Sequence, residues 1–475
     1  MCPYASGRAG GMMPLWTSSD LADAVGGKAS AEFEVNGVAF DSREIGEGDL
    51  FFALKGEQSD GHLYVDNIYS AGGAGAVVSE PAEGPHVLVS DTTSALNRLA
   101  IASRSRTSAK IIGVTGSVGK TGTKEALYAA LDRCCFGKAH RSVKSYNNHV
   151  GVPLSLSRMP ADTEYGIFEM GMNHAGELSE LTQLVRPDVA IITAIAPAHI
   201  GNFENIEGIA DAKAEIFEGL TEGGVAVIPY DSPFYTQLRA KAKLYSDHIV
   251  SFGFDKAADV HALEIVPAPN GGSLVTAKVQ DQNLCFTIAE AGKHWVSNAL
   301  AIMAAVKALG GDLTATGLAL AELGGIAGRG KRQTVDLNSG GRALVIDESY
   351  NANPISMKAT LAQFANENSN GQKIAILGAM GELGGEAQHF HEALANDIIT
   401  ANVNIVILVG EEMSHTAAKL STSLDCNAQI SHVASASEAL TEVAKIISDE
   451  DILLIKGSNY LGLAQVVKAL ASGEY

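Results

Sequence analysis

The residues best placed to do chemistry form a short glycine-containing segment between a predicted strand and a predicted helix. They are Thr115-Gly116-Ser117-Val118-Gly119-Lys120-Thr121, followed by Gly122. Glycines let successive backbone N–H groups turn toward a phosphate, and the positive end of the following helix adds to the attraction. In such loops the lysine neutralises the β- and γ-phosphates, and the threonine hydroxyl holds Mg²⁺. Val114 stands where the general phosphate-loop pattern has glycine, so the alternative is an ordinary glycine turn. We predict a nucleotide site.

Two further candidates follow neighbouring predicted strands. Glu169 lies in the apolar run 167–170, and His199 follows the run 189–192. The carboxyl ends of parallel strands meet at one edge of a sheet, which is where ligands bind in such folds. Taken singly, each residue is more simply interpreted as an exposed surface group. Together with Thr121 they predict a metal site at that edge.

Strand and helix patterns that alternate along the chain must position these residues. A strand at 111–114, a helix at 124–131 and a strand at 225–228 predict a parallel sheet with crossover helices. At 259–289 the sequence pattern changes to that of alternating strands, which is typical of a hairpin extension. A predicted helix follows at 294–309. A glycine-rich stretch at 324–330 is typical of a linker. Beyond it we predict strands at 343–347, 373–377, 403–409 and 452–455, with helices at 355–366, 387–400, 436–447 and 461–471.

The fold class predicted is therefore α/β with three domains, which also suits a chain of 475 residues. We expect a small N-terminal α/β domain at 14–107, a central phosphate-loop domain with a parallel sheet at 108–326, and a doubly wound, Rossmann-like C-terminal domain at 327–475.

The composition excludes several classes of protein. The net charge of -20 argues against a nucleic-acid binder, which needs a basic surface. We find no apolar run near the ~20 residues that span a bilayer, and residues 1–13 lack the apolar core of a secretory signal. Met12 or Met13 could be an alternative start. The five cysteines have no metal-ligand spacing, so we expect reduced thiols and a cytoplasmic protein.

The short form Thr-Gly-x-x-Gly-Lys-Thr resembles the Mur ligases and their relatives, the folylpolyglutamate synthetases, and the resemblance extends over nearly the whole chain. The N-terminal part resembles the uridine-nucleotide domain of Mur ligases, which folylpolyglutamate synthetases lack. It does so through Phe40-Asp41-Ser42-Arg43, Gly48-Asp49-Leu50-Phe51-Phe52-Ala53-Leu54 and Asp60-Gly61-His62. The resemblance implies that Ser42, Arg43, Asp60 and His62 bind a UDP-substrate. Alone, these residues also fit a surface pair and a turn.

Motifs of the central segment resemble the family in the same order. Asn147 and Asn148 stand in the family's substrate-contacting Asn-Asn-x-x-Gly, although two asparagines alone also suit a turn. The resemblance implies that Glu169 and His199 bind metal and that Lys213, within 211–215, is carbamylated. Without it, Lys213 between two acidic residues is a solvated helix-face lysine.

The resemblance also implies the nucleotide contacts. Asn298, near the start of the helix that begins with His294, matches the adenine-contacting position, although Trp295 stands where asparagine is common. Arg329 and Asp347 match the nucleotide-contacting residues of the last domain. The implied ATP-binding set adds these three to residues 115–122.

Within the family, the C-terminal motifs resemble the members that add a D-alanyl-D-alanine dipeptide. These are Tyr350-Asn351-Ala352-Asn353-Pro354, Leu377-Gly378-Ala379-Met380-Gly381-Glu382-Leu383-Gly384 and Lys456-Gly457-Ser458, and they imply that Asn351 and Asn353 bind the dipeptide. The Asp-Asn-Pro-Arg of the diaminopimelate-adding members is absent. At 459–462 the arginine expected by resemblance is absent too.

The implied activity is ATP-dependent joining of D-alanyl-D-alanine to UDP-N-acetylmuramoyl-tripeptide through an acyl phosphate. It implies two Mg²⁺ ions, and we further expect a cytoplasmic monomer that binds neither nucleic acid nor membrane. Two alternatives stay open: a Mur ligase that adds a single amino acid, and a non-catalytic phosphate-loop switch, which would need neither Lys213 nor a uridine-binding domain. The third residue of the tripeptide is also open.

Overall fold

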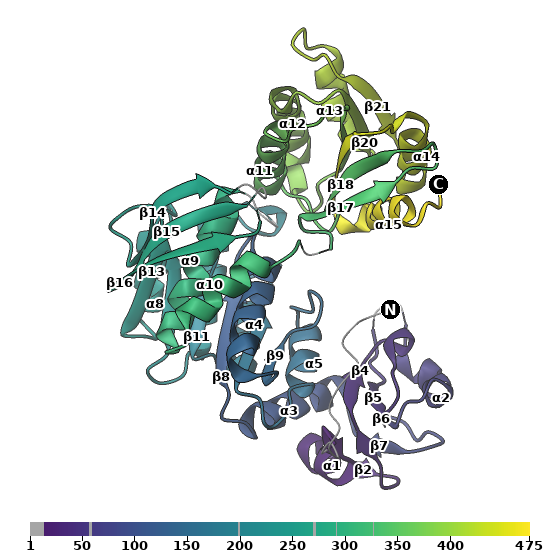
Figure 1. Ribbon diagram of the computed structural model, residues 1–475. Helices are drawn as coiled ribbons and strands as arrows, with labels where there is room; N and C mark the ends of the chain where they lie inside the picture. The colour runs from purple at the N-terminus through teal and green to yellow at the C-terminus, as the bar shows by residue number, and fades with distance from the viewer. Residues whose placement is uncertain (1–13, 57–58, 198–199, 269–271, 291, 326) are drawn as a thin grey trace.

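The computed structural model describes residues 14–475 apart from 57–58, 198–199, 269–271, 291 and 326. Its strands form three main sheets that follow one another along the chain (Figure 1). The predicted α/β class with three domains is therefore confirmed. No helix in the described part of the chain combines the length and the apolar character that a bilayer crossing requires.

The N-terminal sheet has the strand order β2-β7-β6-β5-β4, in which β4 to β7 are parallel and β2 is antiparallel. Leu50 and Phe52 face one core while Phe51 faces the other, because successive side chains of a strand point to opposite sides. The elements are β1 (Trp16–Thr17), α1 (Ser18–Val25), β2 (Lys28–Ala29), β3 (Glu34–Val35), β4 (Gly37–Ala39), β5 (Asp49–Phe52), α2 (Val65–Ser70), β6 (Gly75–Val78), β7 (His86–Leu88) and α3 (Thr92–Ser105).

The central sheet has nine strands in the order β16-β15-β14-β13-β12-β11-β8-β10-β9. Strands β8 to β14 pair in parallel. Strand β14 also pairs antiparallel with β15, and β15 with β16, which forms the predicted extension. The strands are β8 (Lys110–Thr115), β9 (Ala139–Arg141), β10 (Tyr165–Glu169), β11 (Val189–Ile192), β12 (Val225–Pro229), β13 (His248–Gly253), β14 (Val260–Pro267), β15 (Ser273–Val279) and β16 (Gln282–Ile288).

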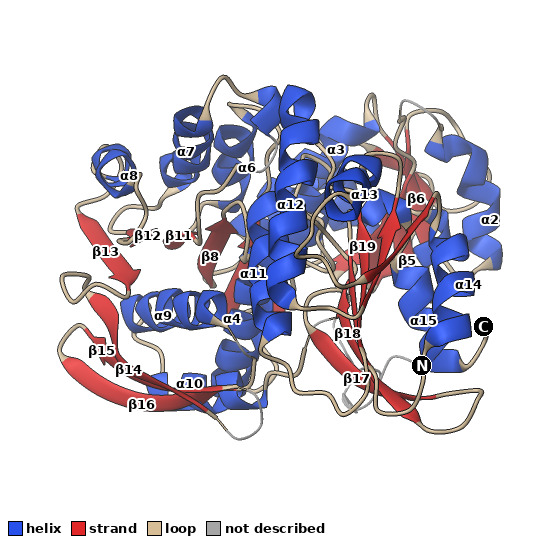
Figure 2. Ribbon diagram, turned by 90° about the horizontal axis from the view of Figure 1, so that it is seen from above, coloured by secondary structure: helices blue, strands red, loops and turns tan. Residues whose placement is uncertain are grey.

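Helices cover both faces of this sheet (Figure 2). Ile112 and Val114 pack with α4 and α9 on one face, and Ile111 packs with α6, α7 and α8 on the other. This alternation explains why β8 is a continuous apolar run. The helices are α4 (Lys120–Cys135), α5 (Gly151–Ser157), α6 (Glu177–Val185), α7 (Ile206–Ala214), α8 (Tyr235–Ala242), α9 (Lys293–Ala308) and α10 (Leu313–Glu322).

The C-terminal sheet has the order β17-β18-β22-β19-β20-β21, parallel except for the β17–β18 pair. Helices α11 to α13 pack on one face, and α14 and α15 pack on the other, which makes the domain doubly wound. The elements are β17 (Lys331–Asp336), β18 (Arg342–Glu348), α11 (Pro354–Ala365), β19 (Lys373–Gly378), α12 (Ala387–Ala401), β20 (Ile405–Val409), α13 (Met413–Ser421), β21 (Gln429–Val433), α14 (Ala436–Ile446), β22 (Ile452–Lys456) and α15 (Ala464–Ser472).

Some predicted element limits differ from the structure. The helix predicted at 461–471 begins only at Ala464, because residues 459–461 form a 3-10 turn and Gly462 has a positive φ of 70°. The helix predicted from 124 begins at Lys120, directly after the glycine loop. Strand β21 and helix α13 were not predicted. Cys134 and Cys135 end α4 as free thiols, and Cys285 and Cys426 are free as well.

The central and C-terminal domains touch through two short turns. The 3-10 turn Ile200–Asn202 packs on the 3-10 turn Gly384–Glu386. Gly201 and Gly384 meet there backbone to backbone: a Cβ on Gly201 would lie 3.1 Å from the Gly384 Cα.

Candidate functional site: a phosphate loop facing a buried carboxylate

The predicted phosphate loop connects β8 to α4 and is built from two glycines with positive φ, 149° at Gly116 and 87° at Gly119. A Cβ on Gly116 would lie 2.0 Å from the Thr193 Oγ1, so only glycine fits there. Helix α4 begins at Lys120 with a glycine cap that offers no side-chain acceptor. Its first N–H groups lack intrahelical partners and can receive an anion.

Lys120 lies folded over this loop. Its Nζ donates a 2.6 Å hydrogen bond to the carbonyl oxygen of Gly116. Burial lowers the pKa of Lys120 below its usual value, opposed by Glu169 and assisted by Arg329. Among the described residues, the ammonium has a backbone oxygen as its one hydrogen-bond partner, so a phosphate would be a better partner for its charge.

The loop is fastened to the segment that follows β11. The Ser117 hydroxyl donates to the carbonyl oxygen of Ala196 at 2.8 Å, and the Ala196 N–H donates back to Ser117 at 2.9 Å. The Thr193 hydroxyl donates to the carbonyl oxygen of Val118 at 2.6 Å. These bonds hold the loop to the segment that follows β11. Thr193 is a loop-positioning residue that the sequence analysis missed.

Glu169 is the last residue of β10, and its side chain is almost fully buried, at 1% exposed. Its carboxylate accepts a 2.8 Å hydrogen bond from the Thr121 hydroxyl and another of 2.8 Å from the Asn147 side-chain amide. The structure thus brings together three residues predicted from separate motifs. The alternative interpretation of Glu169 as an exposed surface group is wrong.

Lys213, near the end of α7, is also buried, at 1% exposed. Burial lowers its pKa well below the usual value, and the nearby Lys120 lowers it further. Its ammonium makes no hydrogen bond or ion pair with any described residue. The alternative interpretation of Lys213 as a solvated lysine is therefore wrong.

His199 lies outside the described residues, so the predicted strand-end set can be assessed only for Thr121 and Glu169. In the described ranges no three His, Cys, Asp or Glu side chains converge as a metal cluster. The hard oxygen atoms of Thr121 and Glu169 are the donors that Mg²⁺ prefers, and they lie beside the phosphate loop.

Helix α9 closes the other side of the loop. A Cβ on Gly119 would lie 2.8 Å from the Asn298 Oδ1, and a Cβ on Gly122 would lie 2.9 Å from the Trp295 ring. The predicted adenine-side Asn298 is therefore in contact distance of the loop. Trp295 fills the space above the first turn of α4.

Arg329 and Asp347 lie at the entry to the C-terminal domain. Asp347 Oδ2 accepts the N–H of Gly328 at 2.7 Å, and its Oδ1 accepts the Ser349 hydroxyl at 2.6 Å. The Arg329 guanidinium lies over the Tyr350 ring, 4.3 Å from the ring centroid. Asp347 thus shapes the turn that presents Arg329, which is close enough to Lys120 to affect its pKa.

The predicted dipeptide residues begin α11. Asn353 caps that helix: its Oδ1 accepts the N–H of Ser356 at 2.9 Å, and Pro354 occupies the first helical position. The exposed Asn351 side chain bonds the N–H of Ala352 at 2.9 Å. Lys456 is 2% exposed, and its Nζ donates to the Asn351 carbonyl oxygen at 3.0 Å and lies 3.2 Å from Glu348 Oε2.

At the predicted uridine end, Arg43 is exposed and forms a two-bond ion pair with Asp41, at 2.9 and 2.6 Å. Side-chain hydrogen bonding from Arg43 lowers the pKa of Asp41 to about 2. Ser42 begins the same 3-10 turn. The exposed position of Arg43 fits the simpler interpretation of Ser42 and Arg43 as surface residues, and its guanidinium meets Asp41 through Nε and Nη2.

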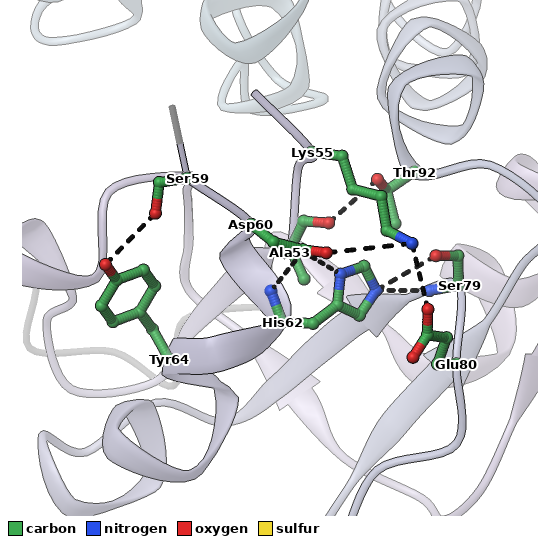
Figure 3. Close-up of polar contacts among 9 residues, drawn as sticks. All are labelled: Ala53, Lys55, Ser59, Asp60, His62, Tyr64, Ser79, Glu80 and Thr92. Atoms are coloured by element: carbon green, nitrogen blue, oxygen red, sulfur yellow. Dashed lines mark hydrogen bonds and ion pairs between the residues drawn. The ribbon is translucent and has the colours of Figure 1, made fainter. Parts of the chain in front are cut away.

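Asp60 and His62 are bonded to each other and to the N-terminal sheet (Figure 3). His62 Nδ1 lies 2.6 Å from Asp60 Oδ1, and His62 Nε2 accepts the backbone N–H of Ser79 at 2.9 Å. A backbone N–H can only donate, so the ring proton is on Nδ1. Both ring nitrogens are thus engaged within the protein, which makes Asp60 and His62 a brace of their loop. Asn148 has a similar local role, because its Oδ1 accepts the N–H of Gly151 at 2.9 Å.

A cavity of about 110 Å³ lies between the central and C-terminal domains and was not predicted. Glu290, His294, Arg332 and Glu348 are among its lining residues. Burial raises the pKa of Glu290 to about 7; Arg332 opposes the rise, and Glu348 adds to it. Nothing in the sequence near Glu290 indicates this environment, since its partners come from beyond the linker.

The fold and the loop define a phosphate-loop α/β protein, and comparison with known proteins identifies its family. Residues 34–106 match the Mur ligase family catalytic domain, residues 114–306 the Mur ligase middle domain, and residues 332–459 the glutamate ligase domain of Mur ligases. The chain therefore belongs to the Mur ligase family.

Individual relatives are similar over their whole length. UDP-N-acetylmuramoyl-tripeptide–D-alanyl-D-alanine ligase of Rickettsia prowazekii is 32% identical, over 95% of this chain and 99% of that protein. The ligase of the same name from Escherichia coli is 32% identical, over 96% and 98%. A crystal structure of MurF from Acinetobacter baumannii superposes with a TM-score of 0.82 at 30% identity, covering 96% of this chain and 99% of that one.

Proposed function

We propose that this protein is an ATP-dependent, ADP-forming ligase that joins D-alanyl-D-alanine to UDP-N-acetylmuramoyl-tripeptide in peptidoglycan synthesis. The observation that carries the proposal is the buried Glu169 carboxylate, 2.8 Å from the Thr121 hydroxyl, beside a preformed phosphate loop. Full-length relatives with this name support the choice of substrates. We place the domain limits at 14–107, 108–326 and 327–475.

In this proposal residues 115–122 bind the phosphates of ATP, with Asn298, Arg329 and Asp347 completing the nucleotide site. The Lys120 ammonium exchanges its hydrogen bond to Gly116 for a contact with the transferring phosphoryl group and neutralises part of its charge. Because the site is buried, this fixed charge is worth more than it would be in water. Arg329 adds a second cation from the C-terminal domain.

Mg²⁺ fits the oxygen donors Thr121 and Glu169, and when bound it supplies neutralisation between the two anions that react. A second ion would need His199 and an anionic Lys213. The Lys213 ammonium would first lose a proton; its neutral amine would then form a C–N bond to CO₂ and lose a second proton, so that a positive side chain becomes a negative carbamate. Lys213 is buried, has a lowered pKa and has no hydrogen-bond or ion-pair partner among the described residues, and these features support that proposal.

The remaining site residues are proposed to bind the UDP-muramoyl-tripeptide and the D-alanyl-D-alanine dipeptide. We propose that Arg43 and Ser42 hold the UDP phosphates, that Asp60 and His62 brace that loop, and that Asn147 and Asn148 hold the substrate near Glu169. Asn351 and Asn353 present the start of α11 to the dipeptide.

The proposed reaction has two steps, formation of an acyl phosphate and formation of the amide bond. A carboxylate oxygen of the tripeptide attacks the γ-phosphorus of ATP, which releases ADP and forms an acyl phosphate. The dipeptide amine attacks the acyl carbon, loses a proton, and inorganic phosphate leaves. We further propose that the protein works as a cytoplasmic monomer.

The test is phosphate release with UDP-muramoyl-tripeptide, ATP and a panel of acceptors. We expect turnover with D-alanyl-D-alanine and little with diaminopimelate, lysine or glutamate, because polar groups left unpaired in a pocket are costly. Comparable rates with a single amino acid would show that the protein is instead a Mur ligase that adds one amino acid. Slow hydrolysis that no acceptor accelerates would instead favour the nucleotide switch.

A further inference from the structure

The segment between β9 and α5 connects the N-terminal domain to the carboxylate site. Lys144, in the middle of that segment, has a positive φ of 53°, a conformation that a side-chain-bearing residue adopts only when neighbours hold it. Three residues later Asn147 donates to Glu169. Lys144 and the Asn147 side chain that contacts Glu169 therefore lie on one short segment.

Lys144 is held from the central domain by Lys124. The Lys124 side chain is fully buried, and its Nζ donates a 2.5 Å hydrogen bond to the carbonyl oxygen of Lys144. The same ammonium lies 2.9 Å from Glu125 Oε1 and 3.9 Å from Glu169 Oε2. Lys124 is one helical turn after Lys120, so α4 carries the phosphate loop and this anchor as one rigid element.

Lys144 is held from the other side by Glu44 of the N-terminal domain. Its ammonium donates to Glu44 Oε1, and the Tyr146 hydroxyl lies 2.9 and 3.0 Å from the two oxygens of the same carboxylate. Burial acts to raise the pKa of Glu44, but these hydrogen bonds outweigh it and the pKa lies below its usual value. Glu44 is the last residue of the 3-10 turn that also contains Ser42 and Arg43, the proposed phosphate contacts.

We propose that Glu44 and Lys124 clamp Lys144 from opposite sides, and that this clamp is a positioning device that carries substrate binding in the N-terminal domain to Asn147 and Glu169. The inference rests on the proposed function only for the identity of the ligands at each end. A pair as exposed as Lys144 and Glu44, with 59% and 27% of their side chains accessible, adds little to stability. Its effect should therefore appear in the geometry of the carboxylate site.

The test compares Glu44→Gln, Lys144→Met and the double variant with Glu47→Gln, a control on an exposed glutamate of the same loop. Calorimetry of ADP binding is repeated over a series of Mg²⁺ concentrations. We expect each clamp variant to raise the Mg²⁺ concentration for half-maximal binding at least threefold, with the double variant no worse than either single variant. Melting temperature and the control should stay at wild-type values.

The clamp is rejected if the Mg²⁺ requirement is unchanged, if the two substitutions act additively, or if Glu47→Gln has the same effect. Because the readout is nucleotide binding, it does not depend on which peptide the enzyme uses. Wild-type protein without D-alanyl-D-alanine turnover would contradict the proposed function and leave the clamp result intact. Lys124→Met is a less informative test of the clamp, because it also removes the buried cation beside Glu125 and Glu169 and can prevent folding.

Discussion

The Thr121 hydroxyl donates to the Glu169 carboxylate across 2.8 Å, which joins the start of α4 to the end of β10. The two residues are 48 positions apart in the chain. Their elements are neighbours because β8 and β10 pair in parallel with register Val114 to Glu169. The strand pairing thus delivers a carboxylate to the first turn after the phosphate loop.

Lys120→Ala should leave the fold intact and lower kcat/KM by roughly 10³, about 4 kcal/mol of transition-state stabilisation. The reason is that the Lys120 ammonium donates to the backbone carbonyl oxygen of Gly116 in the fold but would contact the transferring phosphoryl group in the reaction. Steady-state kinetics check this, with the exposed Lys138→Ala as a charge control. A folded variant that keeps more than a tenth of the activity would refute the phosphate-site assignment.

Lys213→Arg should be nearly inactive, because arginine keeps the positive charge and cannot carbamylate. Lys213→Ala should also be inactive but partly rescued by formate or acetate, which can supply the missing carboxylate in the vacated space. Activity with and without the added acid measures this, and Lys241→Arg on neighbouring α8 is the matched control. A fully active arginine variant would exclude a carbamate.

Arg43→Ala should raise the KM for the UDP-substrate about tenfold with little change in kcat or in ATP affinity. The UDP group lies far from the reacting carboxylate of the substrate, so contacts to it are made equally in the ground and transition states. Asp41→Asn, which frees Arg43 from its ion pair, should lower that KM or leave it unchanged. An effect of Arg43→Ala on ATP binding would contradict the assignment of the N-terminal domain.

Glu290→Gln should stabilise the protein above pH 7 and change little near pH 4. The folded pKa of about 7 lies above the ordinary 4.5, so the folded state binds more protons between these values and loses stability as pH rises through that window. The glutamine variant lacks this loss. The difference in melting temperature between variant and wild type should therefore grow from pH 4 to pH 8; a constant difference would show that Glu290 is not responsible.

Periodicity predicted the strands and helices around the site well, because buried parallel strands are continuous apolar runs. It could not predict the helix start at 464, which depends on Gly462, or the weakly apolar β21. For the site, glycine spacing indicated the loop. The burial of Lys213 and the hydrogen bond between His62 and Ser79 depend on other segments of the chain, so only the fold reveals them.

The contact between Gly201 and Gly384 has a mechanical consequence. Two backbones come close there, and Gly384 has a positive φ of 55°, a conformation that residues with a side chain rarely adopt. A methyl group on Gly384 would lie 2.9 Å from the Gly201 Cα, and it would act as a wedge that props the domains apart. Alanine, serine and valine at position 384 would form a series of increasing steric bulk at this contact between the central and C-terminal domains.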